Sequence, residues 1–502
     1  MADAVRTIVI VGRDAPAWIA ALSLHKALGQ TGVKVSVVEL PSLLNGVEAY
    51  AALPSLQALH ELLEVDEAAV LTAARGVPMV AQRFSNWNGD GAYLQGYDSA
   101  EAPGGFLSFV QLWIKARAQG LKVPFEEFSF GAMAARSGRV PSESDDPKAL
   151  GATYGYHLDA SAYSLLLRAF AVRRGIEVRS GLVRRVEVQA ERIDAVELVS
   201  GERIAADLFI DASGSEAALL STLPADQFES WQAHLPCDRL LSASVGQMTP
   251  RPAFSQISAI DGGWIGMFPL QERTAVTMAF QSSSMTPEQA VAQLQSLAGV
   301  AIGSDAIITT INPGVRKTPW IGNCIAIGEA AAALEPLDGL SLHLAHVCVS
   351  HMITFFPVDR DSAIEAAEYN TAVRLHAANL RDFQQTHYVL NGRAGEPFWD
   401  KARAAPMSDG LAQKLRMFQA RGESVLYEEE TFEAQSWAQM FLGHGCSPRS
   451  YDPRVDLIDQ QDHMQSIQSR LREIGQTIPA LPTIDAFLAA TQIPIKASAA
   501  AS

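Results

Sequence analysis

The chain has 502 residues, with 39 Lys and Arg against 55 Asp and Glu, and a formal net charge of −16. This length exceeds the ~250 to 300 residues at which single cores stop growing, so two or three lobes are expected. The acidic balance argues against nucleic acid or an anionic membrane as a partner. No run reaches the ~18 apolar residues of a membrane helix and no basic leader precedes the first apolar run, which predicts a cytoplasmic protein.

The four cysteines are widely spaced and form no C-x-x-C pair. A reducing compartment is therefore expected, without a cysteine metal centre. His343 and His346 fall at i and i+3 of a predicted helix and could suggest a metal site or a proton relay. Neither they nor His157 has a third ligand at a suitable spacing, so structural histidines are favoured and no metal is predicted.

The first element in chain order is a strand, a tight turn and a helix start over residues 8–18, the layout of a dinucleotide-binding unit. Of the G-x-G-x-x-G pattern only Gly12 remains, because Asp14 stands at the second glycine and Ala17 at the third. Ala17 still permits close approach of helix and strand. A carboxylate at Asp14 would repel a pyrophosphate unless it turns away or is paired, for example by Arg13.

Two neighbouring features support a nucleotide site without deciding it. Pro16 fits a first helical turn, where its missing N–H costs nothing. Glu39 ends the second strand, over residues 33–38, at about the distance expected for the acid that binds a ribose hydroxyl. By itself the eroded turn leaves a nucleotide site and a plain α/β turn equally open.

The remaining pattern alternates between α/β elements and strand-rich segments. A helical stretch is predicted over residues 54–74, then a mixed segment to residue 150, a helix over 159–174 and an exposed hairpin over 184–207. A buried strand and turn follow at residues 208–214, an antiparallel sheet over about 235–312, and another strand followed by a helix at 320–331. From about residue 341 to 475 the pattern is predominantly helical.

Three separated strand-turn elements carry a resemblance to a known family. Ile210-Asp211-Ala212-Ser213-Gly214 and the run from Trp320 to Ala331 follow the Gly12 turn in order. Further matches are Pro54-Ser55-Leu56-Gln57, Arg83-Phe84-Ser85-Asn86-Trp87, Tyr156-His157-Leu158-Asp159-Ala160 and the segment from Ser436 to Asp452. Over roughly residues 5 to 455 the chain resembles the flavin-dependent tryptophan halogenases.

The resemblance implies a chemistry whose central group is changed in this chain. In the family, reduced FAD, oxygen and halide give hypohalous acid, which reaches a lysine beside the substrate. An ungapped match of residues 83–87 places Met79 at this lysine. A thioether can neither form a haloamine nor donate an N–H, and Arg83 is no substitute because it stays protonated. Met79 is therefore read as plain packing.

The family's Pro-Leu-Glu-Ser-Thr-Gly run becomes Pro336-Leu337-Asp338-Gly339-Leu340-Ser341. Asp338 thus stands at the position of the glutamate that assists deprotonation and keeps its charge with a shorter reach. Gly339 and Leu340 replace the pair whose backbone holds halide near the flavin, and their N–H groups persist. Asp338 could equally cap the following helix, and both readings stay open.

A third landmark, W-x-W-x-I-P, becomes Trp264-Ile265-Gly266-Met267-Phe268-Pro269. Trp264, Phe268 and Pro269 are the candidate substrate-binding residues. Gly266 replaces the second indole, which would open volume and let substrate approach the flavin. That change favours hydroxylation over halogenation, or the loss of flavin chemistry altogether.

The candidate cofactor-binding residues surround the three turns. Glu329 takes the place of the aspartate that holds the ribityl chain, one methylene too long, so FAD is predicted on a weakened site, with halide as a further ligand. The set is Gly12, Arg13, Ala15, Pro16, Ala17, Glu39, Gly328, Glu329, Gly339 and Leu340.

The predicted architecture is an α/β FAD/NAD(P)-binding Rossmann-like domain with an inserted antiparallel β-sheet substrate lobe and a helical carboxy-terminal region. The FAD-binding domain would span residues 1–350, with the insert at about 80–155 and 225–315, then helices over 351–495 and a disordered tail at 496–502.

The predicted function is that of an FADH2- and oxygen-using monooxygenase or atypical halogenase on an aromatic or indole-like substrate, supplied by a separate flavin reductase. A homodimer is open. The alternative is a non-catalytic binding protein that has lost or weakened FAD binding.

Overall fold

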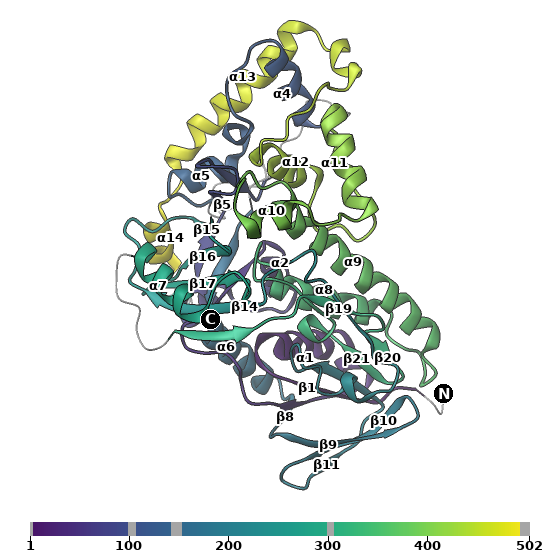
Figure 1. Ribbon diagram of the computed structural model, residues 1–502. Coiled ribbons are helices and arrows are strands. Elements are labelled where there is room, and N and C mark those ends of the chain that lie inside the picture. Colours follow the sequence, from purple (N-terminus) through teal and green to yellow (C-terminus); the bar gives the residue numbers. More distant parts are fainter. Residues whose placement is uncertain (1–3, 99–106, 142–152, 299–305, 492–502) are drawn as a thin grey trace, which may run out of the picture.

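A computed structural model describes residues 4–98, 107–141, 153–298 and 306–491 of the chain (Figure 1). The predicted tail at residues 496–502 and parts of the predicted insert lie outside these ranges. The fold class is confirmed: a parallel sheet with helices, a second and mostly antiparallel sheet, and a helical carboxy-terminal region.

A six-stranded sheet forms the base of the fold, in the order β20-β21-β12-β1-β2-β8. All neighbours pair in parallel except the edge strand β20. Its central strands are short apolar runs buried on both faces, as parallel sheets require. The strands are β1 (Thr7–Gly12), β2 (Lys34–Glu39), β8 (Glu177–Ser180), β12 (Leu208–Ala212), β20 (Trp320–Ile321) and β21 (Cys324–Ala326).

Helix α1 (Asp14–Leu28) packs between α6 (Ala160–Arg173) and α8 (Leu340–Thr354) beside this sheet (Figure 1). Asp159 caps α6 through a hydrogen bond from the Ala162 N–H, which confirms the predicted helix start. The exposed hairpin is also present, as the separate sheet β11-β10-β9 at the far edge of the fold. Its strands are β9 (Val183–Gln189), β10 (Arg192–Leu198) and β11 (Arg203–Ile204).

A seven-stranded sheet forms the second lobe, in the order β18-β14-β17-β16-β15-β5-β6. Its strand pairs are antiparallel except β15 with β5, which is parallel. This pair joins β5, which precedes α6 in the chain, to β15, which follows β12. The strands are β5 (Ala81–Ser85), β6 (Ala92–Gly96), β14 (Arg239–Val245), β15 (Phe254–Ile260), β16 (Gly263–Pro269), β17 (Thr274–Phe280) and β18 (Ile307–Thr310).

Two further three-stranded sheets connect the lobes, with the orders β3-β7-β4 and β13-β19-β22. Their strands are β3 (Ala49–Ala52), β4 (Val77–Met79), β7 (Gly155–Asp159), β13 (Phe228–Ser230), β19 (Gly314–Arg316) and β22 (Ala332–Ala333). In Figure 1 the helices α4, α11, α12 and α13 form the end of the molecule away from the parallel sheet, and α4 packs on α13. The remaining helices are α2 (Ser55–Leu62), α3 (Glu67–Ala73), α4 (Phe109–Ala118), α5 (Phe130–Arg136), α7 (Pro287–Ala298), α9 (Ala363–Val389), α10 (Pro397–Arg403), α11 (Asp409–Arg421), α12 (Ala434–Gly443), α13 (Gln460–Thr477) and α14 (Ile484–Thr491).

Two predicted helices differ in the structure. The stretch at 54–74 is two helices, because Glu64 turns into the left-handed region (φ 54°) and Asp66 starts a new helix with its own cap. The turn after β21 leads to a single 3₁₀ turn, Gly328–Ala330, and the helix begins only at Leu340.

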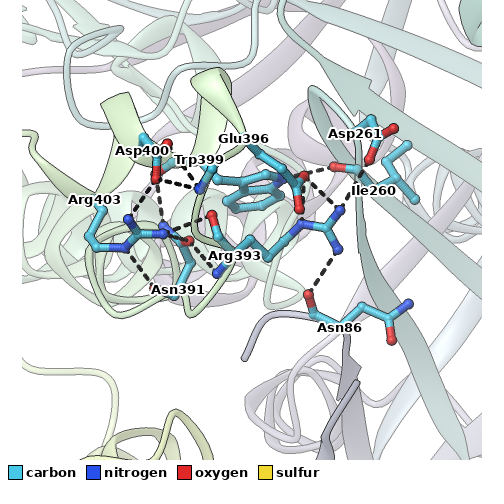
Figure 2. Close-up of polar contacts among 10 residues, drawn as sticks. Asn86, Ile260, Asp261, Asn391, Arg393, Glu396, Trp399, Asp400 and Arg403 are labelled. Carbon is cyan, nitrogen blue, oxygen red and sulfur yellow. Dashed lines mark hydrogen bonds and ion pairs between the residues drawn. The ribbon is translucent and has the colours of Figure 1, made fainter. Parts of the chain in front are cut away.

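A polar junction fixes the carboxyl end of α9 to the seven-stranded sheet. Figure 2 shows Arg393 in ion pairs with Glu396 and with Asp261 of the β15–β16 turn, and in a hydrogen bond to the Asn86 carbonyl. Trp399 donates its indole N–H to the Ile260 carbonyl at 2.9 Å. Residues near the end of α9 are thereby held at a defined position against the sheet.

Candidate functional site

The turn after β1 keeps the main-chain geometry of a nucleotide-binding loop. Gly12 lies opposite Ala212 in the parallel ladder, and a Cβ on Gly12 would stand 2.6 Å from the Ala212 Cβ. Only glycine permits this approach of β1 and β12. Ala17 is fully buried in α1, consistent with close helix packing.

Asp14 begins α1 in the left-handed conformation, with φ 58°. Asp tolerates this region better than most residues, but glycine is its natural occupant. Arg13 does not neutralise Asp14 by direct pairing: its guanidinium lies 3.4 Å from Glu216. The Asp14 carboxyl is instead hydrogen-bonded by Ser42 and by the Leu43 N–H.

Three carboxyl groups share the crevice in front of this turn: Asp14, Glu48 and Glu329. Burial raises the pKa of each, and the charge of Asp14 raises the pKa values of Glu48 and Glu329 further. Their charges also act on the hydroxyl of Tyr50, whose pKa burial already raises. The Glu329 side chain is exposed to solvent. The crevice therefore repels anions when these groups are ionised.

Glu39 ends β2 beside Gly12 but its carboxylate is engaged within the chain. Arg168 donates two hydrogen bonds to it, at 2.7 and 3.0 Å, and Ser180 donates a third at 2.8 Å. Although burial acts in the other direction, these partners lower the pKa of Glu39. A ribose hydroxyl would have to share an already occupied carboxylate.

The other cofactor candidates lie around the same crevice. Gly328 is left-handed (φ 56°) and faces Pro16 of α1 and Ala345 of α8. Gly339 is also left-handed (φ 74°) and starts α8, where Leu340 is buried. The main chain around Gly12, Arg13, Ala15, Pro16 and Gly328 thus fits a dinucleotide, with the three carboxyl groups nearby.

Met79 lies in a closed core. Its side chain is fully buried, and its sulfur is 3.0 Å from the Ser255 hydroxyl, which is 2.8 Å from Nε2 of His157. Burial lowers the pKa of His157 to about 3, so this imidazole is neutral. In the described part of the chain Met79 and Asp338 have no hydrogen-bond partner in common, and the packing interpretation of Met79 stays a prediction.

Trp264, Phe268 and Pro269 are buried rather than exposed to an open space. The Trp264 indole donates to Glu335 at 2.8 Å, and Tyr388 and the Cys237 N–H bind the same carboxyl. The expectation that Gly266 opens volume is wrong, because a Cβ there would lie 2.6 Å from the ring of Phe268. The Phe268 side chain fills the space that the glycine leaves.

Asp338 is buried and strained. Its φ is 61°, one carboxylate oxygen is 3.3 Å from Nε2 of His387, and the other has no hydrogen-bond partner among the described residues. It gives no side-chain cap to α8, whose N-cap is Gly339. The structure therefore does not show the capping alternative.

His387 positions Asp338 from the last turn of α9. Its Nδ1 is 3.0 Å from Nε2 of His444, and its ring stacks on Phe84 with centroids 4.4 Å apart. Burial lowers the pKa of His444 well below its usual range, so its imidazole is neutral. Its Nε2 can then accept a hydrogen bond from the Nδ1–H of His387. Gln384 donates to the carbonyls of Glu335 and Leu337, which fixes α9 to the segment that carries Asp338.

Several polar atoms near Asp338 are buried without a partner in the described residues. Burial and then the charge of Asp338 raise the pKa values of Tyr93 and Tyr97, so both hydroxyls lie within its field. Gln82 and Gln95 face each other across β5 and β6. The unpartnered atoms include the hydroxyl of Tyr93, Oε1 of Gln95 and Oδ2 of Asp338, whereas Tyr97 and Gln82 interact with each other.

A cavity of about 270 Å³ lies between α2, α8, α12 and the end of β6, and we call it the aromatic cavity. Tyr97 connects it to the field of Asp338. Sequence reasoning missed it because its walls come from segments that are far apart in the chain. Its lining is Leu53, Pro54, Ser55, Tyr97, Asp98, Thr153, His343, Thr431, Phe432, Glu433 and Ser436.

Glu48, Tyr50, Glu335 and His387 were also missed. None belongs to a short motif, and each acquires its environment only through distant partners. Among the described residues no group of three or more His, Cys, Asp or Glu could hold a metal ion. In the same residues no helix is long and apolar enough to cross a membrane.

The parallel sheet with its glycine turn and the second, mostly antiparallel lobe form the fold of the flavin-dependent halogenases. The sequence profile of the family "Tryptophan halogenase" matches residues 7–460. The chain belongs to this family.

Similar proteins support this assignment over nearly the whole length. Tryptophan 7-halogenase KtzQ of Kutzneria sp. (strain 744) is 27% identical, over 96% of this chain and 98% of its own. Xcc4156, a flavin-dependent halogenase from Xanthomonas campestris, is 28% identical with a TM-score of 0.92, over 97% of this chain and 98% of its own. BrvH, a flavin-dependent halogenase from Brevundimonas sp. BAL3, is 27% identical with a TM-score of 0.90, over 97% and 99%.

Proposed function

We propose that this chain is a flavin-dependent oxidoreductase that acts on an aromatic small molecule without a lysine haloamine, as a monooxygenase or an atypical halogenase. FAD, reduced by a separate reductase, would supply the oxidising chemistry together with molecular oxygen as the oxidant. Gly12, Arg13, Ala15, Pro16 and Ala17 would hold it on α1. The rest of the crevice set is Glu39, Gly328, Glu329, Gly339 and Leu340, the last two beside a halide.

The state of Asp338 carries this proposal. A left-handed non-glycine residue and an unpartnered buried carboxylate oxygen each cost stability, and such costs persist where function retains them. His387, which is itself hydrogen-bonded to His444, holds the other oxygen. Asp338 is therefore suited to accept a proton from a substrate that approaches past Tyr97.

The crevice carboxyls favour a second candidate, a non-catalytic protein of the family that binds an aromatic ligand and has lost FAD. Like charges beside a pyrophosphate weaken binding by Coulomb repulsion. An FAD titration followed by absorbance separates the two candidates. A flavin spectrum that saturates supports the enzyme, and no binding at high FAD overturns it.

If FAD binds, the role of Asp338 is tested with reduced FAD, chloride or bromide and an indole panel. Asp338→Asn should lower kcat by about 10²-fold or more with little change in KM, and Asp338→Glu should recover part of it, because proton transfer contributes about 10²- to 10⁴-fold. Asp409→Asn, an exposed aspartate of α11, is the control and should leave the rate unchanged. Equal rates for Asp338→Asn and the wild type would contradict the assignment.

A further inference from the structure

We propose that His387 is an imidazolium ion paired with the Asp338 carboxylate, which fixes one carboxylate oxygen and leaves the other as an anionic acceptor for a proton. His387 is then a positioning residue, because it acts on a substrate only through Asp338. This inference deepens the proposed function and rests on it only in calling Asp338 a base. The charge state itself requires neither FAD nor turnover.

Both ring nitrogens of His387 face a group that can accept a hydrogen bond. Nε2 is 3.3 Å from a carboxylate oxygen of Asp338, and Nδ1 is 3.0 Å from Nε2 of His444. Because burial lowers the pKa of His444 well below its usual range, the His444 ring is neutral and has one nitrogen that accepts. A neutral imidazole has one N–H and can donate to only one of these partners, whereas an imidazolium donates to both. The two contacts together favour the charged ring.

The ends of two helices favour the same distribution of charge. Asp338 directly precedes Gly339, the N-cap of α8, and His387 lies in the last turn of α9. The amino end of a helix carries a partial positive charge and the carboxyl end a partial negative charge. An anion is therefore stabilised at Asp338 and a cation at His387.

Aromatic rings enclose the imidazole of His387. It stacks on Phe84 with ring centroids 4.4 Å apart and 23° between the planes, and the centroid of Trp87 lies 5.2 Å away. Phe383 adds an edge contact at 6.3 Å. A cation within about 6 Å of a ring centroid is attracted by the electrons of the ring face, and a neutral imidazole gains no such charge term. The rings thus stabilise a charge that water does not reach.

Asp338 is the counter-ion of this site. Both side chains are fully buried, and among the described residues the carboxylate of Asp338 forms an ion pair with His387 and with no Lys or Arg. A buried charge with a partner costs far less than a buried charge alone, so an ionised Asp338 beside a neutral His387 is the less favourable state. Tyr93 and Tyr97 add no competing charge, since burial raises the pKa of both hydroxyls and they keep their protons.

A neutral pair, in which Asp338 carries the proton, is the alternative. It satisfies the hydrogen bond to Nε2 of His387, but it places no charge at the two helix ends or beside the aromatic rings, which then contribute nothing. A protonated Asp338 also cannot accept a proton from a substrate. The ion pair instead leaves a negative charge on Oδ2 of Asp338, which has no partner among the described residues.

The charge state is measured by nitrogen-15 NMR of the full chain labelled at histidine, without flavin and at neutral pH. His387 should carry a proton on both ring nitrogens. Its signals are assigned by their loss in His387→Gln, or in His387→Asn if the first variant does not fold. His157, whose pKa burial lowers to about 3, should show one N–H and is the internal reference. A single ring proton on His387 overturns the proposal.

Two carboxyl variants test whether Asp338 is the counter-ion. Asp338→Asn should remove one of the two ring protons of His387, since the amide has no charge to balance the cation. Asp409→Asn, at an exposed aspartate of α11, is the matched control and should leave both protons in place. An imidazolium that persists in Asp338→Asn overturns the pairing.

The effect of His387 on Asp338 is measured by infrared spectroscopy of the carboxyl C=O band. His387→Gln keeps a side-chain donor for Asp338 but removes the charge, so the unpaired buried carboxylate should take up a proton. This uptake appears as a new C=O band that is lost in the double variant His387→Gln/Asp338→Asn. A His387→Gln spectrum without the new band overturns the positioning role, and a thermal melt of each variant verifies folding.

The outcomes separate this inference from the proposed function. A chain that contains the ion pair but never turns over leaves the inference standing and overturns the enzymatic function. A neutral His387 in a chain whose rate depends on Asp338 overturns the inference and leaves the function standing.

Discussion

The flavin crevice and the aromatic cavity have changed in opposite ways. In the crevice the main chain keeps the tight turn at Gly12 and the left-handed turn at Gly328, but the carboxyls of Asp14, Glu48 and Glu329 oppose a phosphate. Around the cavity and Asp338 the polar side chains form connected hydrogen bonds, and aromatic rings hold them. The crevice thus keeps its main-chain geometry beside three carboxyl groups, whereas around Asp338 and the cavity the side chains are organised by hydrogen bonds and ring contacts.

The largest effect is expected when lysine replaces Met79. This variant asks whether lysine-dependent chemistry can be restored between the two regions. Met79→Lys puts an ammonium in a fully buried position beside the neutral His157, so unfolding free energy should fall by on the order of 3 kcal/mol. Urea denaturation measures this. Met79→Leu, which conserves volume, should cost less than about 1.5 kcal/mol. A stable lysine variant that halogenates would show instead that the site is open.

A second variant removes a carboxyl group from the crevice and tests its effect on FAD binding. Asp14→Gly should tighten FAD binding by about tenfold or more, since it removes a charge near the phosphates and suits the φ of 58°. Quenching of flavin fluorescence gives the affinity. Glu473→Gln, at an exposed glutamate of α13, is the distant control. An unchanged affinity for Asp14→Gly would mean that the carboxyl faces away from FAD.

The same titration has a pH dependence of known sign. The pKa values of Asp14, Glu48 and Glu329 are raised in the folded chain, mainly by burial. These groups take up protons before their unfolded counterparts, so they favour the fold at low pH and cost stability as pH rises through their raised pKa values. FAD affinity of the wild type should therefore increase on acidification, and this increase should be smaller in Asp14→Gly.

A further effect concerns the packing beside Trp264. Gly266→Ala should lower the unfolding free energy by about 1–3 kcal/mol, because the added methyl group meets the ring of Phe268 at 2.6 Å. Gly246→Ala, where nothing lies within 4 Å, is the control. If Gly266→Ala is as stable as the wild type, Phe268 can leave this space and a ligand could enter it.

The sequence was most informative where a structure depends on local pattern. The strand over residues 274–280, the helix after Asp159 and the exposed hairpin over 184–207 were all predictable, because each follows from periodicity or a cap within a few residues. The break at Glu64 was not, since residues on both sides have good helical spacing.

Sequence by itself also determined the family, since ordered motifs from Gly12 to Asp452 survive many substitutions. Only the tertiary structure decided what occupies the space beside Gly266, because the contact with the Phe268 ring cannot be read from the sequence. It alone also brought Asp14, Glu48 and Glu329 into one crevice and His387 onto Asp338. Charge and packing depend on distances between segments that are remote in the chain, and no local pattern encodes those distances.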